Sequence, residues 1–220
     1  MERPHITVNC AASIDGKIST SRRTRLGLSD ESDRTRVGEL RSSCDAVAVG
    51  INTVLSDNPS LAVYGRGSDG AHPAKVVFDS KGRTPADARI LDGGGKVYIV
   101  TEESCSRSVQ GAAMLRCGRG RVDIPVALSK LKEEGIDSLL VEGGGEIIFE
   151  FARLGLIDRM FIYTAPLIVG GRGAPTVADG TGMDAESGFA PFRLVSVRAF
   201  GMGVLAEYVK GGKWRADGER

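Results

Sequence analysis

The stretch best suited to ligand binding or catalysis is Glu142 and the three glycines after it, which lie between two apolar runs. The run before it, Leu139–Val141, predicts a buried strand, and the run after it, Ile147–Leu154, has helical spacing. Three residues without a Cβ let the chain turn sharply and let a ligand approach the backbone. A helix start offers unpaired N–H groups and a positive dipole end, so this stretch predicts a phosphate or pyrophosphate site. A plain strand-to-helix turn is the alternative, and the spacing is not the Gly-x-Gly-x-x-Gly of Rossmann folds.

A second candidate site comprises residues 79–83 (DSKGR), directly after the apolar strand predicted at Lys75–Phe78. A hydroxyl, a lysine and an arginine in this place suit a phosphate, although a charged hairpin would have the same composition. Two weaker candidates lie in expected helices. Thr53 and Asp57 are four residues apart and would face the same way. Arg41 is a cation in a last helical turn, where the helix dipole alone would favour it.

The composition argues against several other functions. The two histidines and four cysteines have no metal-ligand spacing, and no Gly-x-Ser-x-Gly elbow occurs, so we expect neither a metal site nor a serine hydrolase. A net charge of +1 gives no general case for nucleic acid or an anionic membrane as partner. No apolar stretch approaches the ~20 residues of a membrane span, and the N-terminus lacks a signal-peptide core, so the cytoplasm is the expected location.

The elements that must position these residues alternate between strand and helix, and three strand-like runs close the chain. This order predicts one α/β domain over residues 1–220, with a mainly parallel sheet flanked by helices and antiparallel strands at its C-terminal end. We expect Ser29 to cap the first helix, the glycine-rich segment Pro166–Gly182 to lie over one sheet edge, and residues 211–220 to fray. The expected strands are Ile6–Ala12, Ala46–Val49, Lys75–Phe78, Lys96–Val100, Ala113–Cys117, Leu139–Val141, Arg159–Ala165, Arg193–Ala199 and Gly203–Lys210.

Five segments together resemble the reductases of riboflavin biosynthesis, which are related in fold to dihydrofolate reductase. They occur in the family's order and span roughly Ile6 to Lys210. Each is weak alone, but five in order make a strong signal. The segments are Ala12–Lys17 (ASIDGK), Gly50–Pro59 (GINTVLSDNP), Val77–Ser80 (VFDS), Leu140–Gly145 (LVEGGG) and Ala165–Gly171 (APLIVGG).

The resemblance implies a homodimeric enzyme that uses NADPH, with NADH possible, to reduce a pyrimidinone ribosylamine 5′-phosphate and open its ribose into a ribityl chain. Bacterial relatives are usually fused to a zinc deaminase with an H-x-E and P-C-x-x-C signature, which this sequence lacks. It is therefore similar to the archaeal and fungal enzymes, which reduce before deamination. Asn9 fits this interpretation, since the fused enzymes tend to carry lysine there. The implied substrate is 2,5-diamino-6-ribosylamino-4(3H)-pyrimidinone 5′-phosphate.

Carried over by position, the resemblance places Arg41 at the substrate phosphate and makes Glu142 a hypothetical proton donor or orienter. Two positions depart from the family: Tyr64, where bacterial relatives often have a phosphate-binding arginine, and Leu26, which replaces an aromatic residue beside the cofactor. Ser80 and Lys81 would recognise the 2′-phosphate of NADPH. The implied substrate-binding residues are Asn9, Ser13, Arg41, Leu61 and Glu142; the implied cofactor-binding residues are Ala12, Thr53, Asp57, Val77, Phe78, Asp79, Ser80, Lys81, Gly143, Gly144, Gly145 and Glu146.

Three other functions remain open at this point: a reductase of the deaminated pyrimidine, a dihydrofolate-reductase-like pterin reductase, and a non-catalytic nucleotide-binding module. Preference for the deaminated substrate would favour the first, and methotrexate binding the second. Tight NADPH binding without oxidation by any ribosylaminopyrimidine would favour the third.

Overall fold

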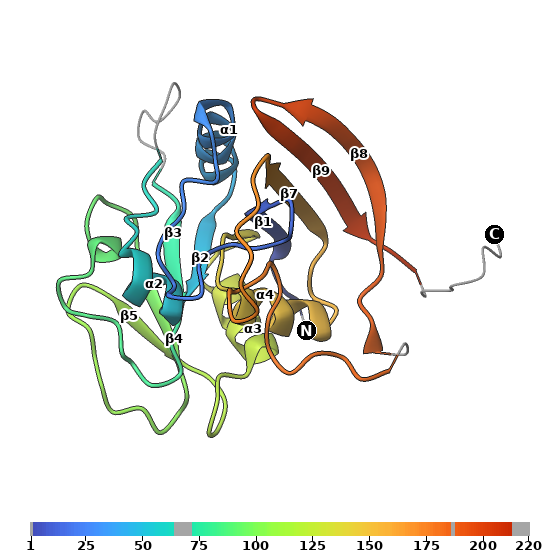
Figure 1. Cartoon of the computed structure of the whole chain (residues 1–220). Helices are drawn as coiled ribbons and strands as arrows, with labels where there is room; N and C mark the ends of the chain where they lie inside the picture. The colour runs from blue at the N-terminus through green and yellow to red at the C-terminus, as the bar shows by residue number, and fades with distance from the viewer. Residues whose placement is uncertain (1, 64–71, 186–187, 213–220) are drawn as a thin grey trace.

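The computed structural model describes residues 2–63, 72–185 and 188–212, and it contains one nine-stranded sheet between two layers of helices (Figure 1). The strand order is β5-β4-β3-β2-β6-β1-β7-β9-β8. The strands are β1 (His5–Ser13), β2 (Ala46–Gly50), β3 (Ala74–Phe78), β4 (Val97–Thr101), β5 (Ala113–Arg116), β6 (Ser138–Val141), β7 (Arg159–Ala165), β8 (Phe192–Phe200) and β9 (Gly203–Lys210). The helices are α1 (Glu31–Ser42), α2 (Ile51–Asp57), α3 (Ile124–Glu133) and α4 (Gly145–Arg153), with a short 3₁₀ helix at Arg89–Leu91.

The sheet is parallel except at β9, which pairs antiparallel with both β7 and β8. The expected α/β fold with antiparallel pairing at its C-terminal end is therefore confirmed. The parallel strands β1, β2, β3 and β6 all end at the same edge of the sheet. Side chains placed directly after them consequently lie near one another.

Two apolar layers hold the helices against the sheet. On one face, alternate residues of the central strands, such as Val8 and Val141, pack with Leu128 and Leu131 of α3 and Phe151 of α4. On the other face, the intervening residues pack with α2 and the 3₁₀ helix, and Leu40 of α1 joins them. Both faces are covered, which explains why the central strands read as continuous apolar runs.

The start of α1 differs from the prediction by one residue. The N-cap is Asp30, whose Oδ1 accepts from the Asp33 N–H at 2.9 Å, whereas Ser29 donates its hydroxyl to Asp33 Oδ2. Asp30 also accepts from the Tyr163 hydroxyl at 3.0 Å and from the Met202 N–H. The bonds from the Met202 and Asp33 N–H groups lower the pKa of Asp30. Because Met202 lies in the β8–β9 turn, its bond to Asp30 also holds this turn against the start of α1.

The glycine-rich segment 166–182, which we expect over one sheet edge, lies at the edge that the carboxyl ends of the central strands form. Asp15, which follows β1, accepts from the Val169 and Gly170 N–H groups at 3.0 and 2.7 Å. Farther along, the Asp179 N–H donates to Gly145 O at 3.0 Å. The segment is therefore tied to β1 and α4, two elements that border the candidate site.

Two predictions fall on residues outside the described ranges. Tyr64 lies between the described ranges that end at residue 63 and resume at residue 72, and residues 213–220 of the expected frayed tail lie after the last described residue. In the described ranges, no helix is both long and apolar enough to cross a membrane.

Candidate active site

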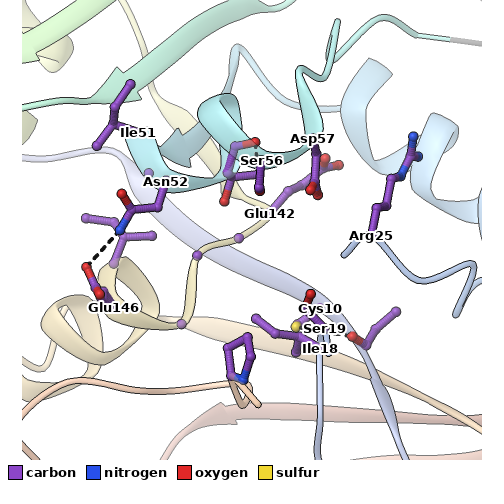
Figure 2. Close-up of a pocket in the computed structure, with 18 of the residues that line it drawn as sticks. Cys10, Ile18, Ser19, Arg25, Ile51, Asn52, Ser56, Asp57, Glu142 and Glu146 are labelled. Carbon is purple, nitrogen blue, oxygen red and sulfur yellow. Dashed lines mark hydrogen bonds between the residues drawn. The ribbon is translucent and has the colours of Figure 1, made fainter. Parts of the chain in front are cut away.

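A cavity of about 1370 Å³ opens at the carboxyl ends of β1, β3 and β6, between α1, α2 and the start of α4 (Figure 2). Its volume exceeds the ~300–1,000 Å³ that is usual for a site of one small molecule. The cavity brings together most of the residues that the sequence singled out. These are Arg41, Thr53, Asp57, Phe78, Ser80, Lys81, Glu142, Gly143, Gly144, Gly145 and Glu146.

The glycine turn forms one wall of this cavity. Gly143 and Gly144 have φ of +153° and +89°, which side-chain-bearing residues rarely adopt. Helix α4 begins at Gly145, two residues before its apolar run. Its N-cap is Gly144, which makes no side-chain capping bond. Gly145 is tightly enclosed, because a Cβ there would lie 2.6 Å from Thr176 O. The result is a helix N-terminus whose first N–H groups have no partner within the helix and border the cavity.

Glu142 and Arg41 form an ion pair at the centre of the site. Arg41 Nε and Nη2 donate to the two Glu142 carboxylate oxygens at 2.8 and 2.6 Å, and Nη1 donates to Ala62 O at 2.8 Å. Their side chains are only 17% and 9% exposed, which strengthens the charge-assisted bonds. Arg41 therefore joins three segments: α1, the end of β6 and the chain after α2.

A group of cations borders the cavity beyond the glycine turn: Lys81 and Arg83 after β3, and Arg121 before α3. Arg83 Nη2 donates to Asn52 Oδ1 at 3.4 Å, and Asn52 Nδ2 donates to Glu146 Oε2 at 3.2 Å. These bonds link Arg83 to the first turns of α2 and α4. The sequence reasoning named Lys81 and Arg83 as a phosphate site, and the fold adds Arg121 from a distant loop.

Alternation along β3 separates the predicted cofactor residues into two sets. Phe78 and Ser80 line the cavity, whereas Val77 and Asp79 are fully buried beyond it. Successive side chains of a strand point to opposite faces, so a continuous run cannot all contact one ligand. Asp79 instead holds the turn after β3, because its Oδ2 accepts from the Thr84 N–H and hydroxyl at 2.7 and 2.8 Å.

Four other predicted residues do not line the cavity. Asn9 is buried and accepts from Arg36 Nη2 at 2.7 Å, and Ser13 is buried with its hydroxyl bonded to Asp15 Oδ1 at 2.6 Å. Ala12 is buried beside the cavity-lining Ala11, and Leu61 packs in the apolar layer over α2. Because none of the four lines the cavity, their assignment to substrate or cofactor binding stays a prediction.

Apart from Arg41, the residues that α1 contributes to the cavity are not predicted from the sequence. Glu31, Arg34, Thr35 and Gly38 line the cavity along one face of α1, together with Arg41. Their spacing of three and four residues is a signal that could have identified this face. Gly38 in a helix interior is a second signal, since glycine there costs about 1 kcal/mol relative to alanine.

Cys10 also borders the cavity, but its environment suppresses thiol chemistry. Complete burial and the nearby Asp33 charge raise the pKa of Cys10 to about 12. The thiol is therefore protonated near neutral pH and is no nucleophile. In the described part of the chain, no three His, Cys, Asp or Glu side chains gather as metal ligands would.

These features define an α/β protein with one large cavity at the carboxyl edge of its sheet, bordered by cations and by a helix N-terminus. A family model described as the RibD C-terminal domain matches residues 4–206, and the chain belongs to this family. A 2,5-diamino-6-ribosylamino-4(3H)-pyrimidinone 5′-phosphate reductase from Methanothermobacter thermautotrophicus is 38% identical over 216 residues, covering 95% of this chain and 100% of that protein. A protein of the same name from Archaeoglobus fulgidus is 38% identical, with coverages of 91% and 95%.

Longer relatives match over part of their length. The riboflavin biosynthesis protein RibD of Actinobacillus pleuropneumoniae is 34% identical, and the match covers 94% of this chain and 57% of that protein. Among solved structures, a Thermotoga maritima protein has 28% identity and a TM-score of 0.78, over 95% of this chain and 57% of that one. It is described as a diaminohydroxyphosphoribosylaminopyrimidine deaminase/5-amino-6-(5-phosphoribosylamino)uracil reductase. The predicted family and fold are thus confirmed.

Proposed function

We propose that this protein reduces 2,5-diamino-6-ribosylamino-4(3H)-pyrimidinone 5′-phosphate to the ribitylamino compound with NADPH as reductant. The observation that carries the proposal is one cavity with room for both molecules, bordered by an uncapped helix start and by the Arg41–Glu142 pair. The two archaeal relatives that match along nearly their whole length bear the name of this reductase.

The residues of the cavity fit a nicotinamide dinucleotide phosphate. The glycine turn leaves space beside Gly143, where a Cβ would meet only Thr53 Oγ1 at 3.9 Å. A diphosphate there would accept from the first N–H groups of α4 and gain from the helix dipole. Ser80 and Lys81 would then contact the 2′-phosphate, with Arg83 and Arg121 adding positive charge nearby.

Bound NADPH would supply a hydride, and the protein's part is to orient the sugar and exclude water. Glu142 lies at the centre of the site, where its carboxylate would hydrogen-bond the diaminopyrimidine. Arg41 already occupies both carboxylate oxygens through a parallel pair of bonds, which fixes the plane of the group. This arrangement favours an orienting role for Glu142 over proton donation to the opening ribose.

The cofactor assignment is tested by Lys81→Gln. Removing this cation takes away an ionic contact to a 2′-phosphate that NADH lacks, so KM for NADPH should rise about tenfold or more while KM for NADH stays unchanged. Steady-state kinetics with both cofactors measure this. Arg119→Gln is the matched control, because Arg119 is an exposed cation of the Arg121 loop that does not line the cavity. Equal losses for both cofactors would refute the assignment of Lys81.

We also propose that the protein forms a homodimer through its C-terminal strands. β8 ends the sheet with β9 as its one neighbour, and it stands apart from the helical layers (Figure 1). Its side chains are exposed on both faces, including Leu194, Val195 and Val197. An exposed apolar edge strand is what a second copy could pair with or cover.

A further inference from the structure

The part of the cavity wall that comes just before α1 depends on other elements for its position. This segment, residues 25–31, lines the cavity with every member except Asp30. Residues 26–30 belong to neither a helix nor a strand, so contacts with neighbouring elements must fix them. In Figure 2, Arg25 of this segment lies on the other side of Glu142 from Glu146, which is in the first turn of α4. The segment therefore lies away from the glycine turn to which the cofactor diphosphate is assigned.

Asp30 joins this segment to β7 and to the β8–β9 turn. Its Oδ2 accepts from the Tyr163 hydroxyl at 3.0 Å and from the Met202 N–H, and Figure 1 shows the tip of this hairpin beside α1. Burial and the neighbouring Asp30 carboxylate raise the pKa of Tyr163 to about 12, so the hydroxyl keeps its proton near neutral pH and remains a donor. The pKa of Asp30 is lowered, so its carboxylate stays ionised. Both partners are thus in the states that form a charge-assisted hydrogen bond.

Apolar contacts support the same segment from behind. Leu28 is buried with Tyr163 and Leu205 in a small core, and Leu26 and Phe200 pack against it. Leu26 and Leu28 also line the cavity, so each contacts the cavity with one part of its surface and this core with another. This part of the cavity wall consequently rests on strands β7, β8 and β9.

The β8–β9 turn fits closely against the helix cap. Gly201 has a φ of +55°, and a Cβ there would lie 2.7 Å from Asp30 Oδ1, so a side chain at this position would overlap the carboxylate. Gly203 lies against Tyr163 in the same way, since a Cβ there would lie 2.7 Å from Cζ of the ring. The two glycines therefore allow the close approach that brings the Met202 N–H to Asp30.

We propose that Tyr163 and Asp30 are positioning residues of the reductase site, which hold segment 25–31 in the place that the bound pyrimidine substrate requires. Neither residue lines the cavity, so both act through the segment. The inference rests on the proposed function and deepens it, because it gives the C-terminal strands a part in substrate binding. Since the cofactor is assigned to the glycine turn and Lys81, loosening the segment should weaken binding of the pyrimidine and leave that of NADPH unchanged.

The first test compares two tyrosine hydroxyls that make the same kind of bond. Tyr98 is buried, as Tyr163 is, and donates to Glu134 Oε2 at 2.9 Å, but neither Tyr98 nor Glu134 lines the cavity. Tyr163→Phe and Tyr98→Phe should both lower Tm by a few degrees, because each removes a bond to a carboxylate.

Steady-state kinetics should then separate the two variants. Tyr163→Phe should raise KM for the pyrimidine about fivefold or more, with kcat and the KM for NADPH little changed, because the bound substrate loses a correctly placed wall. Tyr98→Phe should match the parent protein in all three values. A KM for the pyrimidine that was the same in Tyr163→Phe as in Tyr98→Phe would overturn the proposal.

The second test moves the turn and needs no turnover. Gly201→Ala and Gly135→Ala both place a Cβ at a position of positive φ, +55° and +86°, but at Gly135 the Cβ would meet no atom within 4 Å. Amide hydrogen exchange at Asp33 and Arg34, whose N–H groups donate to Asp30, should be faster in Gly201→Ala and unchanged in Gly135→Ala. Unchanged exchange in Gly201→Ala would overturn the proposal. If the exchange results held but the parent protein never oxidised NADPH, the proposed function would fail and the support of this segment by the β8–β9 turn would stand.

Discussion

At the scale of single residues, the pairing of Glu142 with Arg41 decides how the centre of the site can work. Sequence reasoning identified both residues separately, one from its place before the glycines and one from its place in a last helical turn. It could not identify their bond, because the two lie 101 positions apart and meet only through the packing of α1 beside β6. Because of this bond, the two candidate binding residues hold each other in place at the centre of the site.

Glu142→Gln distinguishes the two roles considered for this carboxylate. A proton donor contributes about 10²–10⁴ to the rate, whereas loss of an orienting contact chiefly weakens substrate binding. We expect KM for the pyrimidine to rise while kcat stays within about tenfold of the parent value, with its pH profile unshifted. Glu150→Gln, at another cavity-lining glutamate, serves as control. A kcat loss of a hundredfold or more with a changed pH profile would establish proton transfer.

At the scale of elements, local patterns predicted the strands more accurately than the element junctions. Continuous apolar runs predict the central strands, and each strand in the structure begins and ends within a residue or two of the expected bounds. The start of α1 was wrong by one residue, because Asp30 caps the helix while bonding Tyr163 and Met202, partners that are remote in sequence. The place of segment 166–182 likewise depends on remote partners, since Asp15 and Gly145 hold it from other elements.

The contact between this segment and α4 predicts the effect of Gly145→Ala. The added Cβ would lie 2.6 Å from Thr176 O and 2.7 Å from Asp179 Oδ2, so the segment or the helix start must shift. We expect a loss of about 1–3 kcal/mol in the free energy of unfolding, together with weaker NADPH binding. Denaturant unfolding and cofactor fluorescence measure the two effects.

Gly173→Ala is the matched control for this prediction. Gly173 belongs to the same segment, but a Cβ there would meet no atom within 4 Å. The control should therefore unfold and bind cofactor as the parent protein does. If Gly145→Ala behaved like the control, the close packing of segment 166–182 against α4 would not contribute to the cofactor site.

At the scale of the whole molecule, the fold class followed from the order of strand and helix patterns, and the family from five short motifs in order. What the sequence could not show was that Arg23 and Arg25, from the loop before α1, line one cavity together with Arg34 of α1. This group of cations is contributed by a loop and by one face of a helix. A motif search finds residues adjacent in sequence, whereas this group is adjacent only in space.

The proposed dimer is tested by Val197→Asp. Val197 is 59% exposed on the edge strand β8, and a carboxylate there would be costly to bury against a second copy. We expect sedimentation velocity to show a dimer for the parent protein and a monomer for the variant. Ile14→Asp is the control, because Ile14 is 61% exposed on a different surface turn. A dimer that persisted in Val197→Asp would place the interface elsewhere.

The measurement that addresses the central claim most directly is NADPH oxidation at 340 nm with two substrates offered separately: the diaminopyrimidinone ribosylamine phosphate and its deaminated analogue. We expect rapid oxidation with the diamino compound, formation of the ribitylamino product, and little reaction with the analogue. Preference for the deaminated compound would keep the reductase fold and site but contradict the proposed substrate. No oxidation with either would contradict the proposed reaction and favour a pterin reductase or a nucleotide-binding module.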